Sequence, residues 1–299
     1  MRRLSALPAV LLVIVAGSFF LMRLAPGGPF DMDRALPEAV RLNIEAKYHL
    51  DEPLPRQYLR YLGDVVRGDF GPSFRYPDRT VNELIALGFP VSLTLGLCAL
   101  AFALVVGGAA GVVAGIRHNR WVDHLTMSLA LGGVSVPNFV LGPLLILAFA
   151  LGLGWLPVAG WGSWRHLVLP TITLGVFYTA YVARLSRAGM LEVILQDFVR
   201  TARAKGVREA AVVTRHALPN AVLPVVSYLG PAAASALTGS VVVETIFGIP
   251  GVGRYFVQSA LNRDYTMVLG TVVFYSMLLV AFNLIVDCLY AYLDPRVTY

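Results

Sequence analysis

Cationic side chains gather in one stretch of the chain, Phe198–Pro219, which has the sequence FVRTARAKGVREAAVVTRHALP. Its basic residues are Arg200, Arg203, Lys205, Arg208 and Arg215. Most of the stretch permits an α-helix, and Gly206 near its middle acts as a local break, because glycine costs about 1 kcal/mol in a helix interior. We therefore expect a helix–glycine–helix elbow within residues 190–219, closed by Pro219.

Two uses of this basic elbow fit its composition. An amphipathic helix at a membrane surface would place its arginines against anionic lipid headgroups. Alternatively, the elbow would dock into a groove of a cytoplasmic motor protein. An apolar row at helical spacing runs along the same stretch and consists of Leu191, Ile194, Phe198 and Ala202. The residues alone leave both interpretations open.

Motifs for nucleotide, metal or hydrolytic chemistry are absent from the sequence. A P-loop needs the pattern GxxxxGK[ST], and neither lysine, Lys47 or Lys205, follows a glycine. No HExxH or CxxC pattern occurs, and Cys98 and Cys288 each lie inside an apolar run. We therefore expect no catalytic residue, no metal site and no cofactor in this chain. If ATP drives it, another subunit must bind the nucleotide and its magnesium ion.

The elements that must position the elbow are those of a membrane protein. The chain has 299 residues, of which 57% are hydrophobic and 14% charged, whereas soluble domains carry about 25% charged residues. A helix that crosses a bilayer needs about 20 mostly apolar residues. The candidate spans are Leu4–Leu24, Phe89–Ile116, Leu125–Leu151, Val168–Leu185, Leu223–Val243 and Met267–Leu289. The sequence therefore predicts an all-α membrane protein with six transmembrane helices in a lipid bilayer.

The distribution of arginine predicts how these spans are oriented. With the N-terminus inside, the short cytoplasmic segments contain Arg2, Arg3, Arg117 and Arg120 as well as the elbow. Short cytoplasmic loops are enriched in Lys and Arg, so we expect both termini and the elbow in the cytoplasm. The first span, residues 1–24, has a longer apolar run than a signal peptide and is expected to be retained. The net charge of +6 follows this topology and gives no reason to expect nucleic-acid binding.

Three regions follow from this topology. Residues 1–24 form the first transmembrane helix, and residues 25–88 form a small helical insertion outside the membrane. In the insertion, apolar residues recur at helical spacing after Pro37, and a second helix is expected from Pro55. The insertion is either a compact cap without a site or a docking surface for an external partner. Residues 89–299 form a core of five spans.

The spans themselves suggest close packing without an energy source. Gly107, Gly111 and Gly115 recur at four-residue intervals, which lets helix backbones approach closely in lipid. No Asp, Glu, Lys or Arg lies near the centre of any predicted span. Ion-coupled carriers place ionisable groups at membrane depth. The spans can therefore form a pathway, and a stand-alone secondary carrier is disfavoured.

The elbow resembles the cytoplasmic signature loop of permease subunits of ABC importers. That loop has the pattern EAA, three residues, Gly, nine residues, then I-x-L-P. Ala202, Gly206, Leu218 and Pro219 match it, whereas Arg200, Thr201 and His216 stand where Glu, Ala and Ile are expected. The segments RTARAKG and RHALPNAVLPV are similar to the peptide-importing branch of this family.

Further segments resemble the B-type permeases of oligopeptide importers. They are FFLMRLAPGGPF, YHLDEPLPRQYL with GDFGPSF, GSVVVETIFGIPGVGRYFVQSALNRDY and the terminal DPRVTY. Together they cover most of the chain in order. The resemblance implies a type I ABC importer permease bundle in a bacterial plasma (inner) membrane. The close alternative is a dipeptide or nickel importer permease of the same family.

The resemblance also implies partners. A homologous second permease subunit would pair with this chain, two cytoplasmic ATPase subunits would dock below, and an extracytoplasmic peptide-binding protein would deliver the peptide substrate. ATP hydrolysis in the partners would drive alternating access. The residues that would couple to the ATPases are Arg200, Thr201, Ala202, Arg203, Lys205, Gly206, Val207, Arg208, Leu218 and Pro219.

A constrained turn follows the fifth predicted span. Glu244 lies near the outer end of that span, and Gly248, Pro250 and Gly251 belong to the GIPGVG segment that comes next. These residues are candidates for an outer gate. Alternatively, they form a helix-end cap and a rigid hairpin.

Overall fold

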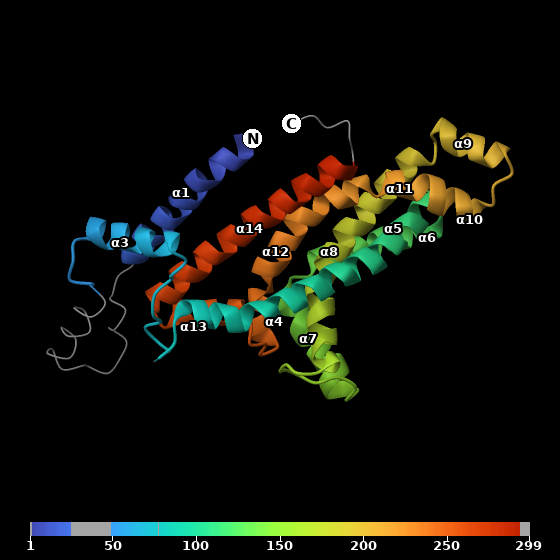
Figure 1. Cartoon of the computed structure of the whole chain (residues 1–299). Coiled ribbons are helices and arrows are strands. Elements are labelled where there is room, and N and C mark those ends of the chain that lie inside the picture. Colours follow the sequence, from blue (N-terminus) through green and yellow to red (C-terminus); the bar gives the residue numbers. More distant parts are fainter. Residues whose placement is uncertain (1, 25–48, 77, 294–299) are drawn as a thin grey trace. The chain divides into compact units, whose positions relative to one another are not determined.

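The computed structural model describes residues 2–24, 49–76 and 78–293, and within these ranges the regular elements are helices (Figure 1). One isolated antiparallel bridge joins Pro72 and Thr80. The described chain forms two compact units. The first comprises residues 1–91 and 250–280, and the second comprises residues 92–249 and 281–298. The fold is therefore all-α, as the sequence predicts.

The first unit contains three helices and parts of two others. Its elements are α1 (Arg2–Leu24), α3 (Leu54–Val66), the beginning of α4 (Val81–Phe102), α13 (Val252–Leu261) and the beginning of α14 (Tyr265–Leu293). Helix α3 begins where the sequence predicts a helix, with a proline in its first turn. The helix predicted after Pro37 lies outside the described residues. The core of this unit includes Val65, Phe70, Val81 and Met267.

A buried aspartate organises the turn between α13 and α14. Asp264 accepts a hydrogen bond from the Ser73 hydroxyl. The backbone N–H of Phe74 donates a second hydrogen bond to the same carboxylate, at 3.2 Å. Asp264 also accepts one from the backbone N–H of Met267, at 3.1 Å, and so satisfies a free donor in the first turn of α14. One carboxylate therefore holds the loop before α4 and caps a long helix.

The second unit contains the longest fully described helix. Its elements are the end of α4, η1 (Ala103–Gly107), α5 (Gly108–Ile116), α6 (Trp121–Ser135), α7 (Asn138–Leu145), η2 (Ile146–Gly152), α8 (Trp164–Val193), α9 (Asp197–Ala204), α10 (Glu209–Ala211), η3 (Val212–Ala217), α11 (Leu218–Ala221) and α12 (Leu223–Ile246). Helix α8 packs against α5, α6 and α12, and so it is the central element of this unit. It extends beyond the predicted span Val168–Leu185 at both ends.

The helices differ from six uninterrupted spans. Val81–Ile116, Trp164–Val193 and Tyr265–Ile285 are each long and apolar enough to cross a membrane. Two bent pairs would bring the number to five, while Ala9–Leu24 is a shorter apolar helix. The predicted third span, Leu125–Leu151, breaks into α6 and α7 with a bend of 104°. Pro137 explains the break, because it donates no backbone hydrogen bond and it favours the extended conformation found at Val136.

Candidate functional site

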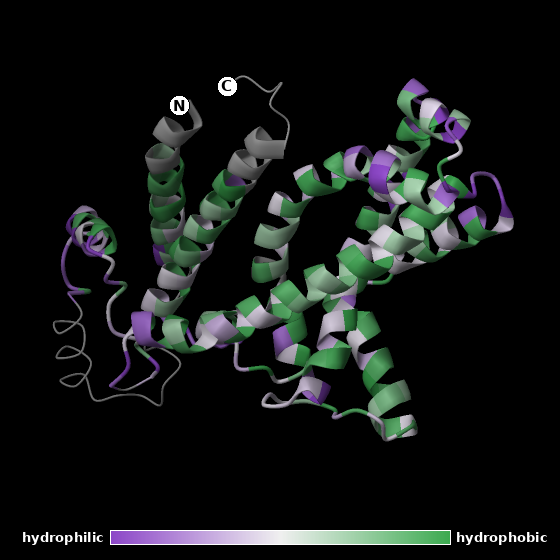
Figure 2. Ribbon diagram, turned by 45° about the vertical axis from the view of Figure 1, so that its right-hand side comes forward, coloured by the Kyte–Doolittle hydropathy of each residue, from purple (hydrophilic) through white to green (hydrophobic). Residues whose placement is uncertain are grey.

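The basic stretch folds as an elbow at one end of the second unit. We call residues 194–219 the elbow; it comprises the break at residues 194–196, α9, a turn at Gly206, α10, η3 and the start of α11 (Figure 1). Figure 2 shows hydrophilic residues concentrated in α9 and the turn, while the adjoining helices are largely hydrophobic. The helix–glycine–helix arrangement predicted from the sequence is therefore present.

Gly206 ends α9 in a left-handed conformation with φ of +76°. Its N–H donates to the carbonyl of Arg203 at 2.9 Å, and the N–H of Val207 donates to the carbonyl of Ala202 at 3.3 Å. These two bonds form a Schellman motif, which satisfies carbonyls that the helix end would leave unpaired. No atom lies within 4 Å of a Cβ added at Gly206, so the glycine is required by its φ angle and not by crowding.

An ion pair spans the turn. Arg203 donates to Glu209 through Nε at 3.1 Å and through Nη2 at 2.6 Å. The bond to Glu209 raises the pKa of Arg203 above its ordinary value. Both side chains are exposed, so the pair contributes at most about 1 kcal/mol to stability. Its consequence is geometric, because Arg203 is turned toward α10 and is not a free cation.

The inner face of the elbow is buried against the helix bundle. One apolar cluster joins the elbow and α11 to α8; its members are Val199, Ala202, Val212, Ala217 and Ala221 together with Met190 and Val193 of α8. Val112 of α5 packs against this cluster. In addition, the α-carbon of Gly189 in α8 faces the backbone of Ala221, where an added Cβ would lie 3.0 Å from the Ala221 carbonyl carbon. The elbow is thus fixed to the end of α8.

The outer face carries cations and two apolar side chains. Arg200, Lys205, Arg208 and Arg215 are exposed, and Leu195 and Phe198 are 67% and 44% exposed. Of the predicted apolar row, Ala202 and Ile194 do contact the cluster, but Phe198 is exposed and Val199 takes the buried position. The reason is the break between α8 and α9 at residues 194–196, which interrupts the helical spacing.

The remaining predicted elbow residues have local roles. The Thr201 hydroxyl donates to the carbonyl of Asp197 at 2.8 Å. Val207 is half-buried beside the cluster on the inner face. Leu218 is half-buried, and Pro219 lies in the first turn of α11, where its missing N–H costs nothing. Of the predicted set, Arg200, Lys205 and Arg208 therefore point their charges outward.

The glycine column lies along α8. A Cβ at Gly107 would come within 2.5 Å of the Thr179 carbonyl oxygen, and one at Gly115 within 2.6 Å of the Met190 Cβ. A Cβ at Gly111 would overlap the Ala183 carbonyl oxygen. Helices η1 and α5 thus approach α8 with their backbones, as small residues allow in membranes.

A buried ion pair near the end of α8 was not predicted from the sequence. Asp123 of α6 is 1% exposed and accepts from Arg187 Nε at 2.5 Å and from Arg187 Nη2 at 2.8 Å. The backbone N–H of Asn119 donates to the same carboxylate at 3.0 Å, and His118 Nδ1 lies 3.5 Å away. The pair fastens the turn between α5 and α6 to α8, about two turns before the end of that helix.

The candidate outer-gate residues divide between the two units. In the second unit, Glu244 is fully buried in α12 and accepts from the hydroxyls of Ser92 and Ser240 at 2.7 and 2.6 Å. Gly248 follows with a φ of +61°. Pro250 and Gly251 belong to the first unit, where Gly251 is the N-cap residue of α13. The structure gives Glu244 a packing role, and a gating role stays a prediction.

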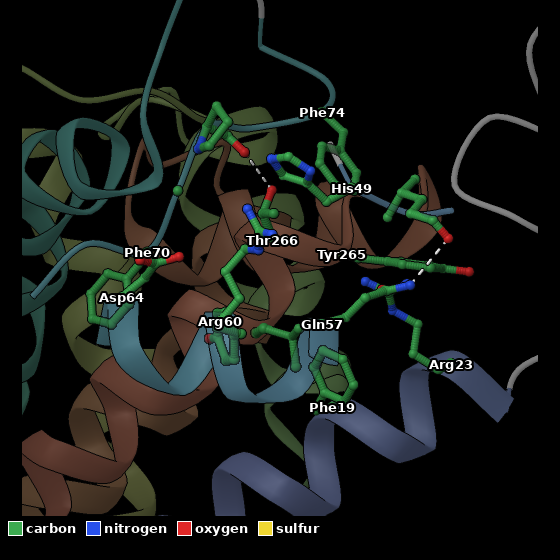
Figure 3. Close-up of a pocket in the computed structure, with 15 residues that line it drawn as sticks. Phe19, Arg23, His49, Gln57, Arg60, Asp64, Phe70, Phe74, Tyr265 and Thr266 are labelled. Atoms are coloured by element: carbon green, nitrogen blue, oxygen red, sulfur yellow. Dashed lines mark hydrogen bonds between the residues drawn. The ribbon is translucent and has the colours of Figure 1, made fainter. Parts of the chain in front are cut away.

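A cavity of about 190 Å³ lies in the first unit (Figure 3). The Arg23 guanidinium lies 5.1 Å from the ring centre of Phe19 and 5.6 Å from that of Tyr265. Arg23 Nε, Gln57 Oε1 and the Tyr61 hydroxyl are buried without a hydrogen-bond partner among the described residues. Burial raises the pKa of the Tyr61 phenol. The cavity therefore offers donors and an acceptor to a small polar group.

The described residues contain no group of three His, Cys, Asp or Glu side chains that could hold a metal ion. The ionisable residues that lie together serve as ion pairs or caps, as in Asp123 with Arg187 and Arg203 with Glu209.

Residues 107–299 match the family model described as "Binding-protein-dependent transport system inner membrane component". The chain is 50% identical over 300 residues to the oligopeptide transport system permease protein OppB of Haemophilus influenzae, covering 100% of this chain and 98% of that protein. It is 48% identical over 296 residues to the dipeptide transport system permease protein DppB of Bacillus subtilis, covering 99% and 96%.

A further relative, the glutathione transport system permease protein GsiC of Pectobacterium atrosepticum, is 40% identical over 304 residues, with 100% of this chain and 98% of that protein covered. Among solved structures, an inward-facing conformation of the MetNI methionine ABC transporter matches with a TM-score of 0.58 at 18% identity, covering 71% of this chain and 96% of that chain. An amino acid ABC transporter matches with a TM-score of 0.52, also at 18% identity, covering 72% and 95%. At this identity the structural matches show the fold alone.

Proposed function

The chain belongs to the family of binding-protein-dependent transport system inner membrane components and is a permease subunit of an oligopeptide ABC importer; from this premise we propose that its elbow is the surface on which a partner ATPase acts. The chain is an inner-membrane component and is not itself the catalytic subunit. Nucleotide hydrolysis then belongs to two cytoplasmic ATPases, with ATP and magnesium bound there, and a homologous second permease completes the membrane pathway.

The observation that carries this proposal is the division of the elbow into a buried inner face and an exposed outer face. The inner face joins the elbow to α8 through Val199, Ala202 and the contact between Gly189 and Ala221. A force on the outer face therefore moves α8, and α8 packs against α5, α6 and α12. An ATPase that changes shape can in this way shift the helices of the pathway as a rigid body.

The same division disfavours the lipid-bound alternative. An interfacial helix binds a membrane by burying its apolar face among acyl chains. In α9 that face is occupied, since Val199 is fully buried and Ala202 is 7% exposed inside the protein. The outward apolar residues are Leu195 and Phe198, flanked by cations. Two apolar anchors within a charged rim are typical of a protein interface.

Orientation follows from the position of the elbow. The elbow must face the cytoplasm to reach an ATPase, and the cations at Arg117 and Arg120 lie on the turn that the Asp123–Arg187 pair fastens beside it. With the elbow inside, the predicted spans would put both termini in the cytoplasm and residues 25–88 outside, in agreement with the distribution of arginine. Helix α3, which belongs to this insertion and is partly exposed, would then be available to an extracytoplasmic peptide-binding protein.

The test measures how many peptide molecules are transported per ATP hydrolysed. The complete transporter is reconstituted into vesicles that contain ATP, the receptor is added, and variants of the permease are compared. A variant with Leu195→Ala and Phe198→Ala should transport fewer peptide molecules per ATP hydrolysed, because the ATPase loses its anchors on the permease. Leu129→Ala is the matched control, since Leu129 is 68% exposed on α6 outside the elbow. Unchanged peptide-to-ATP stoichiometry in the elbow variant, with uptake equal to the control, would refute the assignment.

A dipeptide importer is the second candidate function, favoured by the 48% identity to DppB of Bacillus subtilis. Both candidates use the same elbow and the same mechanism. They differ in the lengths of peptide carried. Competition by unlabelled peptides of two to six residues, measured on uptake by the reconstituted transporter, would separate them.

A further inference from the structure

One face shared by α8 and α12 carries aromatic, hydroxyl and cationic side chains. On α8 it carries Phe177, Tyr181 and Arg184, and on α12 it carries Ser227, Pro231 and Ser235. We call these six residues the polar face. Tyr181 is half-buried and the other five are exposed. The spacings of three to four residues place each set along one side of its helix.

Two contacts join the two halves of the polar face. The ring of Tyr181 stacks on the ring of Tyr228 with centroids 5.6 Å apart and planes inclined by 21°. The Tyr178 hydroxyl donates to Ser235 Oγ at 3.1 Å. Residues of α8 and α12 therefore form one continuous surface that displays aromatic rings, hydroxyl groups and a guanidinium.

Lipid is a poor environment for this surface. Pro231 has no N–H, so the carbonyl of Ser227 receives no helical hydrogen bond from the residue four positions later. In a bilayer core such a carbonyl must find another donor. On other helices of the unit, exposed aliphatic side chains occur within the apolar spans, as at Val105, Leu125 and Leu129. These aliphatic positions suit contact with acyl chains, whereas the polar face suits water or a polar ligand.

Arg184 gives the polar face a charge. It is exposed on α8 and forms no ion pair with a described residue, in contrast to Arg187, which Asp123 holds. Ionisable residues within membrane helices face the bundle interior or a water-filled cavity. A guanidinium stays charged at every physiological pH and binds carboxylates through paired hydrogen bonds.

We propose that the polar face lines the peptide pathway, and that Arg184, at its end nearer the elbow, binds the terminal carboxylate of the passing peptide. This inference rests on the proposed function. A terminal carboxylate is present on every unmodified peptide, whatever its side chains, and it is ionised at neutral pH. Hydroxyls and one open carbonyl meet the peptide backbone in the same sequence-independent way. A single exposed cation binds weakly enough to release its ligand, which transport requires.

Cysteine accessibility tests the location of the face. In the assembled transporter with Cys98→Ala and Cys288→Ala, Ser235→Cys should react with a membrane-impermeant maleimide, and a transported peptide should slow the reaction. Leu129→Cys is the lipid-facing control and should react slowly with or without peptide. A Ser235→Cys that is unreactive, or whose reaction is indifferent to peptide, would show that lipid or the second permease covers the face and would overturn the proposal.

Peptide pairs test the role of Arg184. Uptake into ATP-loaded vesicles is compared for one peptide with a free terminal carboxylate and for the same peptide as its C-terminal amide. Arg184→Gln should lower the rate ratio of free peptide to amide by roughly tenfold, the effect of losing one charge-assisted hydrogen bond. Arg184→Lys should recover part of that ratio. Receptor preference cancels, because every variant uses the same receptor.

Arg165→Gln is the matched control, since Arg165 is exposed at the other end of α8, where its guanidinium lies 5.6 Å from the ring centre of Trp164. It should leave the ratio unchanged. If Arg184→Gln takes up the free peptide and its amide in the same rate ratio as the parent protein does, Arg184 does not bind the terminal carboxylate. Absence of ATP-driven uptake in the parent protein would instead contradict the proposed function, so the two failures are distinguishable.

Discussion

Gly189 of α8 faces the backbone of Ala221 in α11 with no room between them for a side chain. The two residues lie on either side of the elbow in sequence, so their contact closes the elbow at its base. Together with the apolar cluster around Met190 and Val199, it makes the elbow an extension of α8. A rigid base of this kind is what a transmitted movement requires.

Gly189→Ala should destabilise this base. The added methyl group would meet the Ala221 carbonyl, and overpacking of this kind costs about 1–3 kcal/mol. The melting temperature of the purified permease complex should fall, and peptide uptake per ATP should fall with it. Gly108→Ala is the matched control, because no atom lies within 4 Å of a Cβ at that position. Equal melting temperatures for the two variants would contradict the close contact.

Gly206→Ala should strain the turn after α9, because a left-handed conformation costs an alanine about 1–2 kcal/mol. Gly206→Asn should be milder, since asparagine tolerates this conformation better. Hydrogen exchange of the α9 amides measures the effect directly, and exchange should be faster in the alanine variant than in the asparagine variant. The same exchange rate in both would show that the turn does not require a positive φ.

Asp123→Asn should weaken the junction of α6 and α8. Breaking a buried ion pair costs about 3–5 kcal/mol, and this is an upper bound here because the Arg187 side chain is 26% exposed. Replacing both partners, as Asp123→Leu with Arg187→Met, should cost less than Asp123→Asn alone, since no charge is then left unpaired. Thermal unfolding of the two variants decides the order. A double variant less stable than the single one would refute this account of the pair.

The ion pair across the turn can be tested by exchanging its partners. Arg203→Glu places two carboxylates together and should loosen the elbow by up to about 1 kcal/mol, the value of an exposed pair. Adding Glu209→Arg should restore coupling if Arg203 acts through Glu209. Uptake per ATP in the single and double variants is the measurement. Failure of the second substitution to restore coupling would mean that Arg203 contacts the ATPase directly.

The elbow could be predicted from the sequence because its signals are local. A glycine between two helix-forming segments, followed by Pro219, specifies a turn and a restart without reference to the rest of the fold. The register of its buried face could not be predicted in the same way. The break at residues 194–196 shifts the apolar face from Phe198 to Val199, and that break depends on how α8 ends against its neighbours.

Longer-range relationships were beyond the sequence pattern. Asp123 and Arg187 are 64 positions apart, and nothing in the spacing of either residue indicates the other. The spacing of Gly107, Gly111 and Gly115 predicted close helix packing, but only the structure shows that α8 is the helix they pack against. The third predicted span looked continuous by hydropathy, although Pro137 was a local signal for the bend between α6 and α7. The polar face likewise required knowledge of which sides of α8 and α12 stay exposed.

The most direct test of the central claim is photo-crosslinking from Phe198 in the assembled transporter in a lipid bilayer. A photoreactive phenylalanine analogue at this position, 44% exposed on the elbow, should form its main adduct with an ATPase subunit. The same analogue at Leu129 should label lipid or the second permease. Adducts from position 198 that contain only phospholipid would contradict the account, because the elbow would then lie on the membrane and not on the motor.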